Sequence, residues 1–532
     1  MAKNIPGRTK VESIRHKDRR TNIPTEELRD FVAEDERTPK TMLYPRDPSL
    51  DPQLVWKGKD EQDRRDLAVP VVPIYIQEKI HPQAIIDALP RIEQPGSDVP
   101  SLFADFNGGP QDFEKKVDFY HHDQNWTNRL ILGDSLLVMT SLSEKEGLKG
   151  KVQVIYFDPP YGIKFGSNWQ VSTRKRDVKD GRVEDTTRQP EQVRAFRDTW
   201  KLGIHSYLAY LRDRLVVARD LLTETGSVFV QIGDTNVHLV RCILDEVFGS
   251  ENQVATISFQ KTGSIEQALV PHTIDYLLFY AKNIQVAKYR QLYQERTKGS
   301  LALERYDLVL GKDGSLRRIA PEEIDSRELR SEGVRAQLTS LTSARPLGDG
   351  DLRQFEYKGR VYCPSGGTFK TDQSGMRRLM AAGRIQPAGN TLRYLRRVDD
   401  FPVVPLNDRW ESVQLGTGLT YVVQTSARVI ERCLVITTDP GDLVLDPTCG
   451  SGTTAYVAEQ WGRRWITCDT SRVALALART RLMTAKYPYY LLADSPDGIK
   501  REAGLTGKIP PEYKTDGDIR KGFVYRRVPH VT

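Results

Sequence analysis

The sequence predicts an α/β fold built on a doubly wound, mainly parallel sheet. Three observations predict it: apolar runs of strand length alternate with stretches of helical period, two of these runs end in a carboxylate, and one leads through a glycine turn into a helix. Short runs that are apolar throughout are typical of parallel strands covered by helices on both faces. In such folds ligands bind at the carboxyl ends of the strands.

The predicted elements follow one another along the chain. The expected strands are 130–132, 152–157, 227–232, 254–259, 276–280, 443–445 and 464–468, and the expected helices are 205–222, 236–248, 424–437 and 455–461. Each change from an apolar run to a 3.6-residue period marks the passage from a strand to a helix.

An interruption of this pattern divides the chain into segments. Residues 1–125 are polar and punctuated by proline, and only 69–85 are apolar enough to dock on the core. We expect this N-terminal extension, two halves of one α/β domain (126–283 and 406–490), an inserted module of short strands between them (284–405), and a tail (491–532). The tail ends in a strand-like stretch at 522–526, which indicates that longer relatives continue past this point.

Composition excludes several classes of protein. No run approaches the ~18–20 apolar residues that cross a bilayer, and the N-terminus lacks the apolar segment of a secretory signal. Five scattered cysteines form no C-x-x-C pair, and the adjacent His121 and His122 point in different directions, so we expect no metal site. These features favour the cytoplasm. The net charge of +7 is compatible with a polyanionic partner but too small to establish one.

The most informative stretch is Asp158-Pro159-Pro160-Tyr161, which follows the apolar run 152–157. A strand that ends in a carboxylate, two prolines and an aromatic ring builds a rigid pocket at the edge of the sheet. Such a pocket holds a planar base by one polar edge and one face. The alternative is that Asp and Pro merely end the strand.

A second motif lies almost 300 residues downstream. Asp446 ends an apolar run and begins a turn with Gly450, Gly452 and Thr453, after which a helix presents free N–H groups to a ligand. Asp469 ends the next strand, at the separation where nucleotide-binding folds place an acid for ribose hydroxyls. The spacing differs from G-x-G-x-x-G and from G-x-x-x-x-G-K-[ST], so we expect neither NAD nor ATP.

Structural alternatives remain open for several of these residues. Asp469 could be a helix N-cap before Ser471, and Asp134, which follows the strand 130–132, could equally be a cap. Gly450 and Gly452 could serve only helix packing.

The two motifs together resemble the amino-group DNA methyltransferases that use S-adenosylmethionine (AdoMet). A strand ending in DPPY, an insertion, and then DPxxGSGTT is the order of their β class, which includes the modification (Mod) subunits of type III restriction systems. The resemblance covers about 125–486 and implies a Rossmann-like AdoMet-dependent methyltransferase fold.

The resemblance also implies roles for individual residues. Asp158, Pro159, Pro160 and Tyr161 hold the target base in such enzymes. The glycine turn from Asp446 to Thr453 binds the donor, Asp469 takes the ribose hydroxyls, and Asp134 lies near the adenine of the donor. In place of the family's frequent His-Pro-Thr-Gln-Lys-Pro, this chain has Gln-Thr-Ser-Ala-Arg at 424–428, so Arg428 is a candidate substitute for the lysine.

From the resemblance we expect a site-specific DNA methyltransferase that modifies the N6 amino group of adenine by direct in-line transfer onto a flipped-out base. No cysteine directly follows a proline, which argues against covalent attack on cytosine carbon 5. The alternatives are N4-cytosine methylation, methylation of RNA or of a protein amide, and a non-catalytic DNA-specificity subunit. Expected partners are double-stranded DNA, a restriction subunit that supplies nuclease and helicase, and a second copy of the chain.

Overall fold

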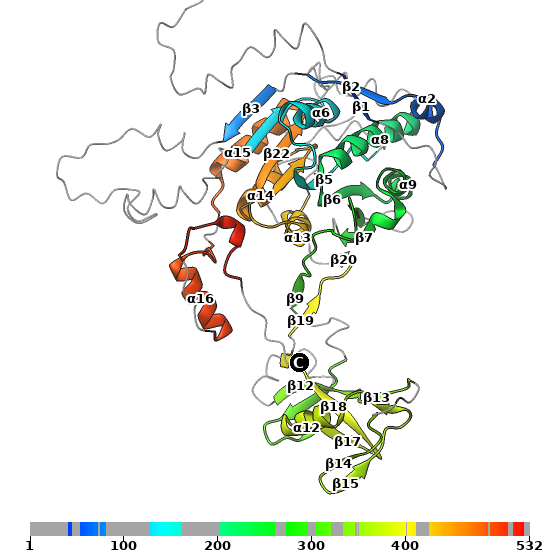
Figure 1. Ribbon diagram of the computed structural model, residues 1–532, viewed down its shortest axis with the longest axis vertical. Helices are drawn as coiled ribbons and strands as arrows, with labels where there is room; N and C mark the ends of the chain where they lie inside the picture. The colour runs from blue at the N-terminus through cyan, green and yellow to red at the C-terminus, as the bar shows by residue number, and fades with distance from the viewer. Residues whose placement is uncertain are drawn as a thin grey trace, which may run out of the picture.

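The computed structural model has a nine-stranded sheet at its centre (Figure 1). The structure describes residues 41–44, 54–72, 75–80, 128–161, 203–260, 273–295, 305–320, 333–345, 348, 351–400, 402–410, 425–487, 490–508 and 514–525. The strand order is β20-β7-β8-β6-β5-β21-β22-β4-β3. In that order the strands are Arg409–Trp410, Gln253–Gln260, Ile274–Ala281, Leu222–Gly233, Val152–Phe157, Leu443–Asp446, Arg464–Asp469, Asn128–Leu132 and Tyr75–Ile80.

Five of the eight neighbouring pairs in this sheet are parallel. They include the four consecutive pairs from β6 through β5, β21 and β22 to β4, whereas β8 pairs antiparallel with β6 and with β7, and β3 pairs antiparallel with β4. The predicted mainly parallel α/β sheet is therefore confirmed. The antiparallel orientation of β8 was not distinguished by sequence, because parallel and antiparallel strands in the interior of a sheet read alike.

Helices cover both faces of the sheet (Figure 1). The helices α6 (Ser135–Lys145), α8 (Ile204–Leu221) and α9 (Val237–Phe248) pack on one face, and α13 (Ala427–Thr437), α14 (Thr453–Gln460) and α15 (Arg472–Thr484) pack on the other. Strand β5 serves both cores, because Ile155 and Phe157 point to the first layer while Val154 and Tyr156 point to the second. All six of its residues are buried, which explains its unbroken apolar sequence.

The segment expected to dock from the N-terminal extension does so in its described part. Strand β2 (Leu67–Pro70) pairs with β1 (Thr41–Tyr44) and buries Val69 in the first core, while β3 adds a strand beside β4. The short helix α2 (Lys59–Asp63) is held by the buried Lys59, whose Nζ lies 2.7 Å from Oε2 of Glu246 on α9. Most of residues 1–125 lie outside the described residues.

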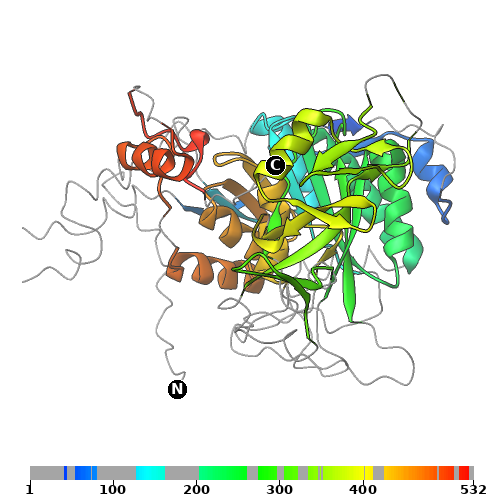
Figure 2. The ribbon, with the colours of Figure 1, turned by 90° about the horizontal axis from the view of Figure 1, so that it is seen from below.

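The chain between the two halves of the main sheet forms a separate antiparallel sheet, which Figure 2 views from its own end of the molecule. Its order is β11-β10-β12-β18-β17, with strands Leu316–Arg318, Leu308–Gly311, Gly333–Ser340, Thr391–Arg397 and Ile385–Ala388. Helix α12 (Gln373–Ala381) packs beside it, with the short strands β13 (Thr342–Ser343), β14 (Phe355–Tyr357), β15 (Arg360–Tyr362) and β16 (Thr368–Phe369). A third apolar core lies here. The boundaries 284–405 stay a prediction.

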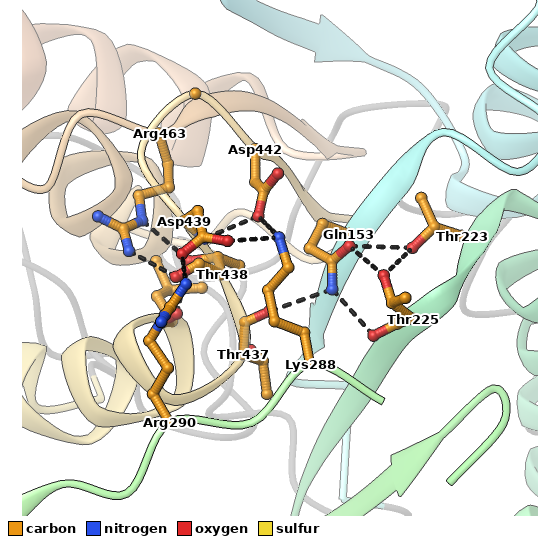
Figure 3. Close-up of polar contacts among 12 residues, drawn as sticks. Gln153, Thr223, Thr225, Lys288, Arg290, Thr437, Thr438, Asp439, Asp442 and Arg463 are labelled. Atoms are coloured by element: carbon orange, nitrogen blue, oxygen red, sulfur yellow. Dashed lines mark hydrogen bonds and ion pairs between the residues drawn. The ribbon is translucent and has the colours of Figure 1, made fainter. Parts of the chain in front are cut away.

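A two-stranded neck joins this module to the main sheet. Strand β9 (Tyr293–Glu295) leads into the module and pairs antiparallel with β19 (Val403–Pro405), which leads out. On the main-sheet side of the neck, the segment before β9 is fastened to the turn before β21 (Figure 3). Lys288 Nζ lies 2.8 Å from Asp439 and 2.5 Å from Asp442, and Arg290 pairs with Asp439. The root of the module is thus fixed to the strand that carries the glycine turn.

The C-terminal tail contains α16 (Pro496–Thr506) and the 3₁₀ turn Ile519–Lys521. The strand expected at 522–526 is replaced by a single bridge between Leu492 and Phe523, and Arg526 lies outside the described residues. No helix in the described part of the chain is long and apolar enough to cross a membrane.

Candidate active site

The carboxyl ends of four adjacent parallel strands bring the predicted site residues to one edge of the sheet. Asp158 follows β5, Asp446 and Asp469 end β21 and β22, and Asp134 lies two residues after β4. From β21 the chain crosses through α14 to β22 on one side, and from β5 through α8 to β6 on the other side. The crevice between β5 and β21 is therefore the topological switch point, where such sheets bind ligands.

A direct hydrogen bond joins the two sequence motifs across this crevice. The backbone N–H of Asp158 donates to the hydroxyl oxygen of Thr448 at 2.9 Å. Thr448 is held in turn by Asp446, whose Oδ1 accepts from the Thr448 N–H at 2.9 Å and lies 3.2 Å from its hydroxyl oxygen. The glycine turn and the DPPY loop therefore form one structure.

The DPPY loop holds its carboxylate half-exposed beside a buried proline. Pro159 is buried, whereas Asp158, Pro160 and Tyr161 are partly accessible. The hydroxyl of Thr425, just before α13, lies 3.4 Å from Oδ2 of Asp158. Asp158 therefore does more than end a strand, because its backbone and its side chain both contact the partner half of the domain.

Tyr161 is held through its hydroxyl and through its backbone carbonyl. Its hydroxyl accepts a hydrogen bond from Nε2 of Gln231 at 2.7 Å and donates to Oδ2 of Asp275 at 3.1 Å. Its carbonyl accepts from Asn236 at 2.7 Å, and a Cβ on Gly233 would lie only 3.0 Å from its ring. Burial raises the pKa of Tyr161 well above its usual value, so the phenol is neutral. These contacts hold the ring in one position.

Gln231 links this tyrosine to the carboxylate. Its Nε2 lies 2.9 Å from the Thr425 hydroxyl oxygen, while its Oε1 accepts from the Tyr156 hydroxyl at 2.5 Å. Sequence reasoning missed Gln231, since a glutamine inside an apolar strand carries no motif. A buried polar residue at position 231 of an otherwise apolar run was the signal that could have found it.

Gly450 and Gly452 of the second motif differ in their structural roles. Gly450 and Gly452 have φ of +51° and +72°, in the left-handed region that favours glycine. Gly452 also lies so close to α15 that an added Cβ would be 2.7 Å from Cβ of Ala478. Helix packing is therefore part of the role of Gly452. Thr453 is buried, and its hydroxyl accepts from Nη1 of Arg481 at 2.8 Å.

Asp469 lies against the glycine turn. Its Oδ2 accepts from the Gly450 N–H at 2.9 Å and its Oδ1 from the Ser471 N–H at 2.8 Å. Ser471, and not Asp469, is the N-cap of α15, so the capping alternative for Asp469 is wrong. Burial raises the pKa of Asp469 to about 6. Asp446 is more deeply buried, and burial likewise raises its pKa to about 6. It orders the turn from inside.

The capping alternative for Asp134 is confirmed. Asp134 is the N-cap of α6 and accepts from the Leu136 N–H at 2.9 Å through Oδ1. Its Oδ2 pairs with Arg214, whose guanidinium lies 3.4 Å above the ring of Tyr210. Arg428, the candidate substitute for the family's lysine, is exposed in the first turn of α13.

These residues fit a nucleoside donor. Asp469 is half-exposed, and a carboxylate retains acceptor capacity beyond two N–H bonds, which suits ribose hydroxyls. Gly450 has the positive φ that favours glycine, and because glycine has no side chain, that part of the turn is open to a ligand. Within the described ranges no group of three His, Cys, Asp or Glu residues is arranged to hold a metal ion.

A doubly wound sheet whose switch point joins a glycine turn to a DPPY loop defines the AdoMet-dependent methyltransferases that modify exocyclic amino groups. A family model described as DNA methylase, covering the N6 and N4 methyltransferases, matches residues 152–480, which is more than half of the chain. The chain belongs to this family, so it is an AdoMet-dependent DNA methyltransferase. The resemblance, the donor and the DNA methyltransferase function predicted from sequence are confirmed.

Individual relatives share only a modest sequence identity with this chain. The type II methyltransferase M.EcaI of Enterobacter cloacae is 26% identical over 68% of this chain and 70% of its own length. The probable HindVI Mod subunit of Haemophilus influenzae, a type III restriction-modification enzyme, is 23% identical over 67% of this chain but only 50% of its own length. The crystal structure of M1.HpyAVI with SAM aligns with 66% of this chain and 98% of its own, at 12% identity and a TM-score of 0.31.

Proposed function

We propose that this chain methylates the N6 amino group of adenine in double-stranded DNA and acts as the modification subunit of a restriction-modification system. The observation that supports this most directly is the Asp158 carboxylate, half-exposed between Thr425 and the glycine turn to which its own N–H is bonded through Thr448. These two contacts support the proposal that the donor turn and the acceptor pocket share one crevice, where a base nitrogen meets the methyl donor.

The chemistry requires residues of this kind. An exocyclic amino nitrogen is a poor nucleophile, because its lone pair is delocalised into the ring. Hydrogen bonds from the amino group to the Asp158 carboxylate and the Pro159 carbonyl favour a tetrahedral nitrogen with a localised lone pair, and this gain is made largely in the transition state. AdoMet supplies an electrophilic methyl group when bound, so transfer needs no covalent enzyme intermediate. The Asp158 carboxylate then holds the proton that the amino group releases.

The target base must leave the duplex to reach this pocket. Extrusion costs a few kcal/mol, and stacking on an aromatic side chain returns about 1 to 3 kcal/mol. Tyr161, held through its hydroxyl by Gln231 and Asp275, is the proposed stacking surface. Tyr161→Ala should therefore reduce the rate of methyl transfer less than Asp158→Ala does.

Adenine is proposed over cytosine because the motif begins with Asp, which among members of the resembling family usually accompanies adenine. N4-cytosine methylation uses the same pocket chemistry and is the second candidate. The Mod-subunit role and a partner that supplies DNA cleavage are proposed from the HindVI relative, of which the matched region spans half. Homodimerisation and action in the cytoplasm, where DNA and AdoMet are both present, belong to the same proposal.

The test is incubation of the full chain with labelled AdoMet and mixed-sequence duplex DNA, followed by nucleoside analysis. We expect label in N6-methyladenine; label only in N4-methylcytosine overturns the base assignment. Parallel reactions with RNA and with protein test the other acceptors, and binding of DNA without any transfer would favour a non-catalytic specificity subunit. Asp158→Ala should bind AdoMet normally and transfer nothing. Transfer by this variant at the parental rate would refute the catalytic role of Asp158.

A further inference from the structure

The inserted module carries the positive charge of the chain. Residues 284–405 contain 22 Lys and Arg and 15 Asp and Glu, a net charge of +7, which equals the +7 of the whole sequence. The rest of the chain is neutral on balance. A basic module on an otherwise neutral protein is the electrostatic pattern expected where a phosphate backbone is bound.

Helix α12 is packed on one side of this module and open on the other. Its Met376 is fully buried in the apolar core of the module, and its N-cap Asp372 accepts from the Gly375 N–H at 2.7 Å. An open groove of about 520 Å³ runs along the opposite side. The residues that line it are Gln373, Ser374, Arg377, Arg378 and Ala381. Their spacing of one, four, five and eight residues places them on one face of the helix.

The two arginines of this face are not used by the fold. Both are exposed, and across the described residues neither Arg377 nor Arg378 forms an ion pair or a hydrogen bond. Arginines that the fold does use look different: Arg384 is buried and bidentate with Asp400, and Arg463 is buried and donates to Thr438. An unpaired Arg on an ordered helix keeps all five N–H donors for a partner.

A third arginine, Arg396, is exposed and has no ion pair or hydrogen bond within the described part of the chain, and it lies on the same side of the module sheet. Tyr394 packs against the core beneath α12, and Arg396, two residues along β18, projects from the same face. Its register partner on β12 is Gln337. The backbone N–H of the intervening Leu395 donates to the carbonyl of Arg384, which follows the end of α12 closely. Arg396 therefore lies near the C-terminal end of α12.

We propose that α12 enters the major groove of double-stranded DNA and that Arg377 and Arg378 read base edges there. The inference rests on the proposed function and assigns its sequence recognition to one helix face. An α-helix with its side chains is about 10–12 Å across, which fits a major groove about 12 Å wide, and α12 has more than two turns to place in it. Arg forks pair with guanine and Gln side chains with adenine, so Gln373 is the third reading residue. Arg396 contacts a flanking phosphate.

The test uses the full chain with Arg377→Ala, Arg378→Ala or Gln373→Ala. Arg501→Ala is the matched control, because Arg501 is an exposed arginine on α16, outside the module. A random-sequence duplex pool is bound, recovered and sequenced, and AdoMet binding is measured separately. Each module variant should lose base preference at one position by about 5- to 150-fold, the usual range for a bidentate base contact. AdoMet binding should not change, and the control should select the parental sequence.

Lysine variants separate base reading from phosphate contact. Arg377→Lys and Arg378→Lys keep the charge but lose the planar fork, so preference should relax while affinity for random DNA is retained. Arg396→Ala should weaken binding to all sequences alike. If every α12 variant selects the parental sequence, the inference is wrong, even where affinity falls. Because this readout needs no methyl transfer, failure to form N6-methyladenine would refute the proposed activity without deciding the role of α12.

Discussion

The hydroxyl oxygen of Thr448 lies 2.9 Å from the backbone nitrogen of Asp158, although 290 residues separate them in the chain. Thr448 belongs to the proposed donor turn and Asp158 to the proposed base pocket. This hydrogen bond and the pairing of β5 with β21 hold the two loops side by side. Methyl transfer would require such positioning to within about half an ångström.

Removal of the Thr448 hydroxyl tests this link. Thr448→Val leaves the Asp158 N–H without its partner, so we expect a loss of about 1–3 kcal/mol in the free energy of unfolding and a decrease in kcat/KM of about tenfold. Thr448→Ser keeps the hydroxyl and should remain near the parental values. Denaturant unfolding and single-turnover methylation measure both effects. A valine variant with parental turnover would show that the link does not position the pocket.

The contact between Thr425 and Asp158 predicts a separable effect on kcat. Thr425→Val removes the hydroxyl that lies between Gln231 and the carboxylate, so Asp158 should be less well oriented while DNA and donor bind as before. We expect kcat to fall by about tenfold with KM nearly constant, and Thr425→Ser to restore it. An equal rise in KM with unchanged kcat would place Thr425 in substrate binding instead.

Donor binding should weaken in mild acid. Burial raises the pKa of Asp469 to about 6, and only the ionised carboxylate accepts all the hydrogen bonds assigned to it. As pH falls through about 6, Asp469 gains a proton and the Kd for AdoMet should rise. Asp469→Asn should bind weakly and lose this pH dependence. Isothermal titration between pH 5 and 8 measures it; a flat parental profile would contradict the assigned role.

The raised pKa of Asp469 also determines how the free energy of unfolding changes with pH. The folded pKa of Asp469 is above the unfolded value of about 3.9, so the native state binds more protons between pH 4 and 6. The contribution of this group to the free energy of unfolding therefore falls as pH rises through that window. Asp446, with the same direction of shift, adds to it.

The close approach of Gly452 to α15 predicts a strong effect of one methyl group. Gly452→Ala places a Cβ 2.7 Å from that of Ala478 at a φ of +72°, so we expect a loss of about 1–3 kcal/mol and weaker AdoMet binding. The matched control is Gly504→Ala, because Gly504 lies within α16 with open space around it and should gain about 0.4–1 kcal/mol. Equal melting temperatures for the two variants would contradict this reasoning.

Local sequence predicted the central strands and the helices that cover them. Val152–Phe157 and Leu443–Asp446 are apolar throughout because both faces are buried, and that pattern is legible without coordinates. The helix before the donor strand was expected from residue 424 and begins at Ala427, after the N-cap Ser426. Sequence could not give the strand order, which depends on long-range pairing.

The structure brings the predicted carboxylates to one edge of the sheet, and their roles stay a prediction; the sequence analysis did not identify the side chains that surround them. Asp158 and Asp469 end strands, and that local feature identified them. Gln231, Thr425 and Thr448 act through hydrogen bonds to residues far along the chain, so sequence could not identify those partners, although Thr448 lies within the second motif. Asp134 is the opposite case: helix capping depends on neighbouring residues, so sequence could predict it, and the structure shows Asp134 as the N-cap of α6.

The neck formed by β9 and β19 means that the chain leaves the catalytic domain and returns to it at one place. The entropy cost of closing a loop grows only slowly with its length. The module beyond the neck can therefore change in size and sequence with little effect on the stability of the main domain. If the module reads the target sequence, as proposed above, target preference and methylation chemistry can diverge independently. A new specificity would arise by exchange of a module between relatives, with the crevice inherited intact.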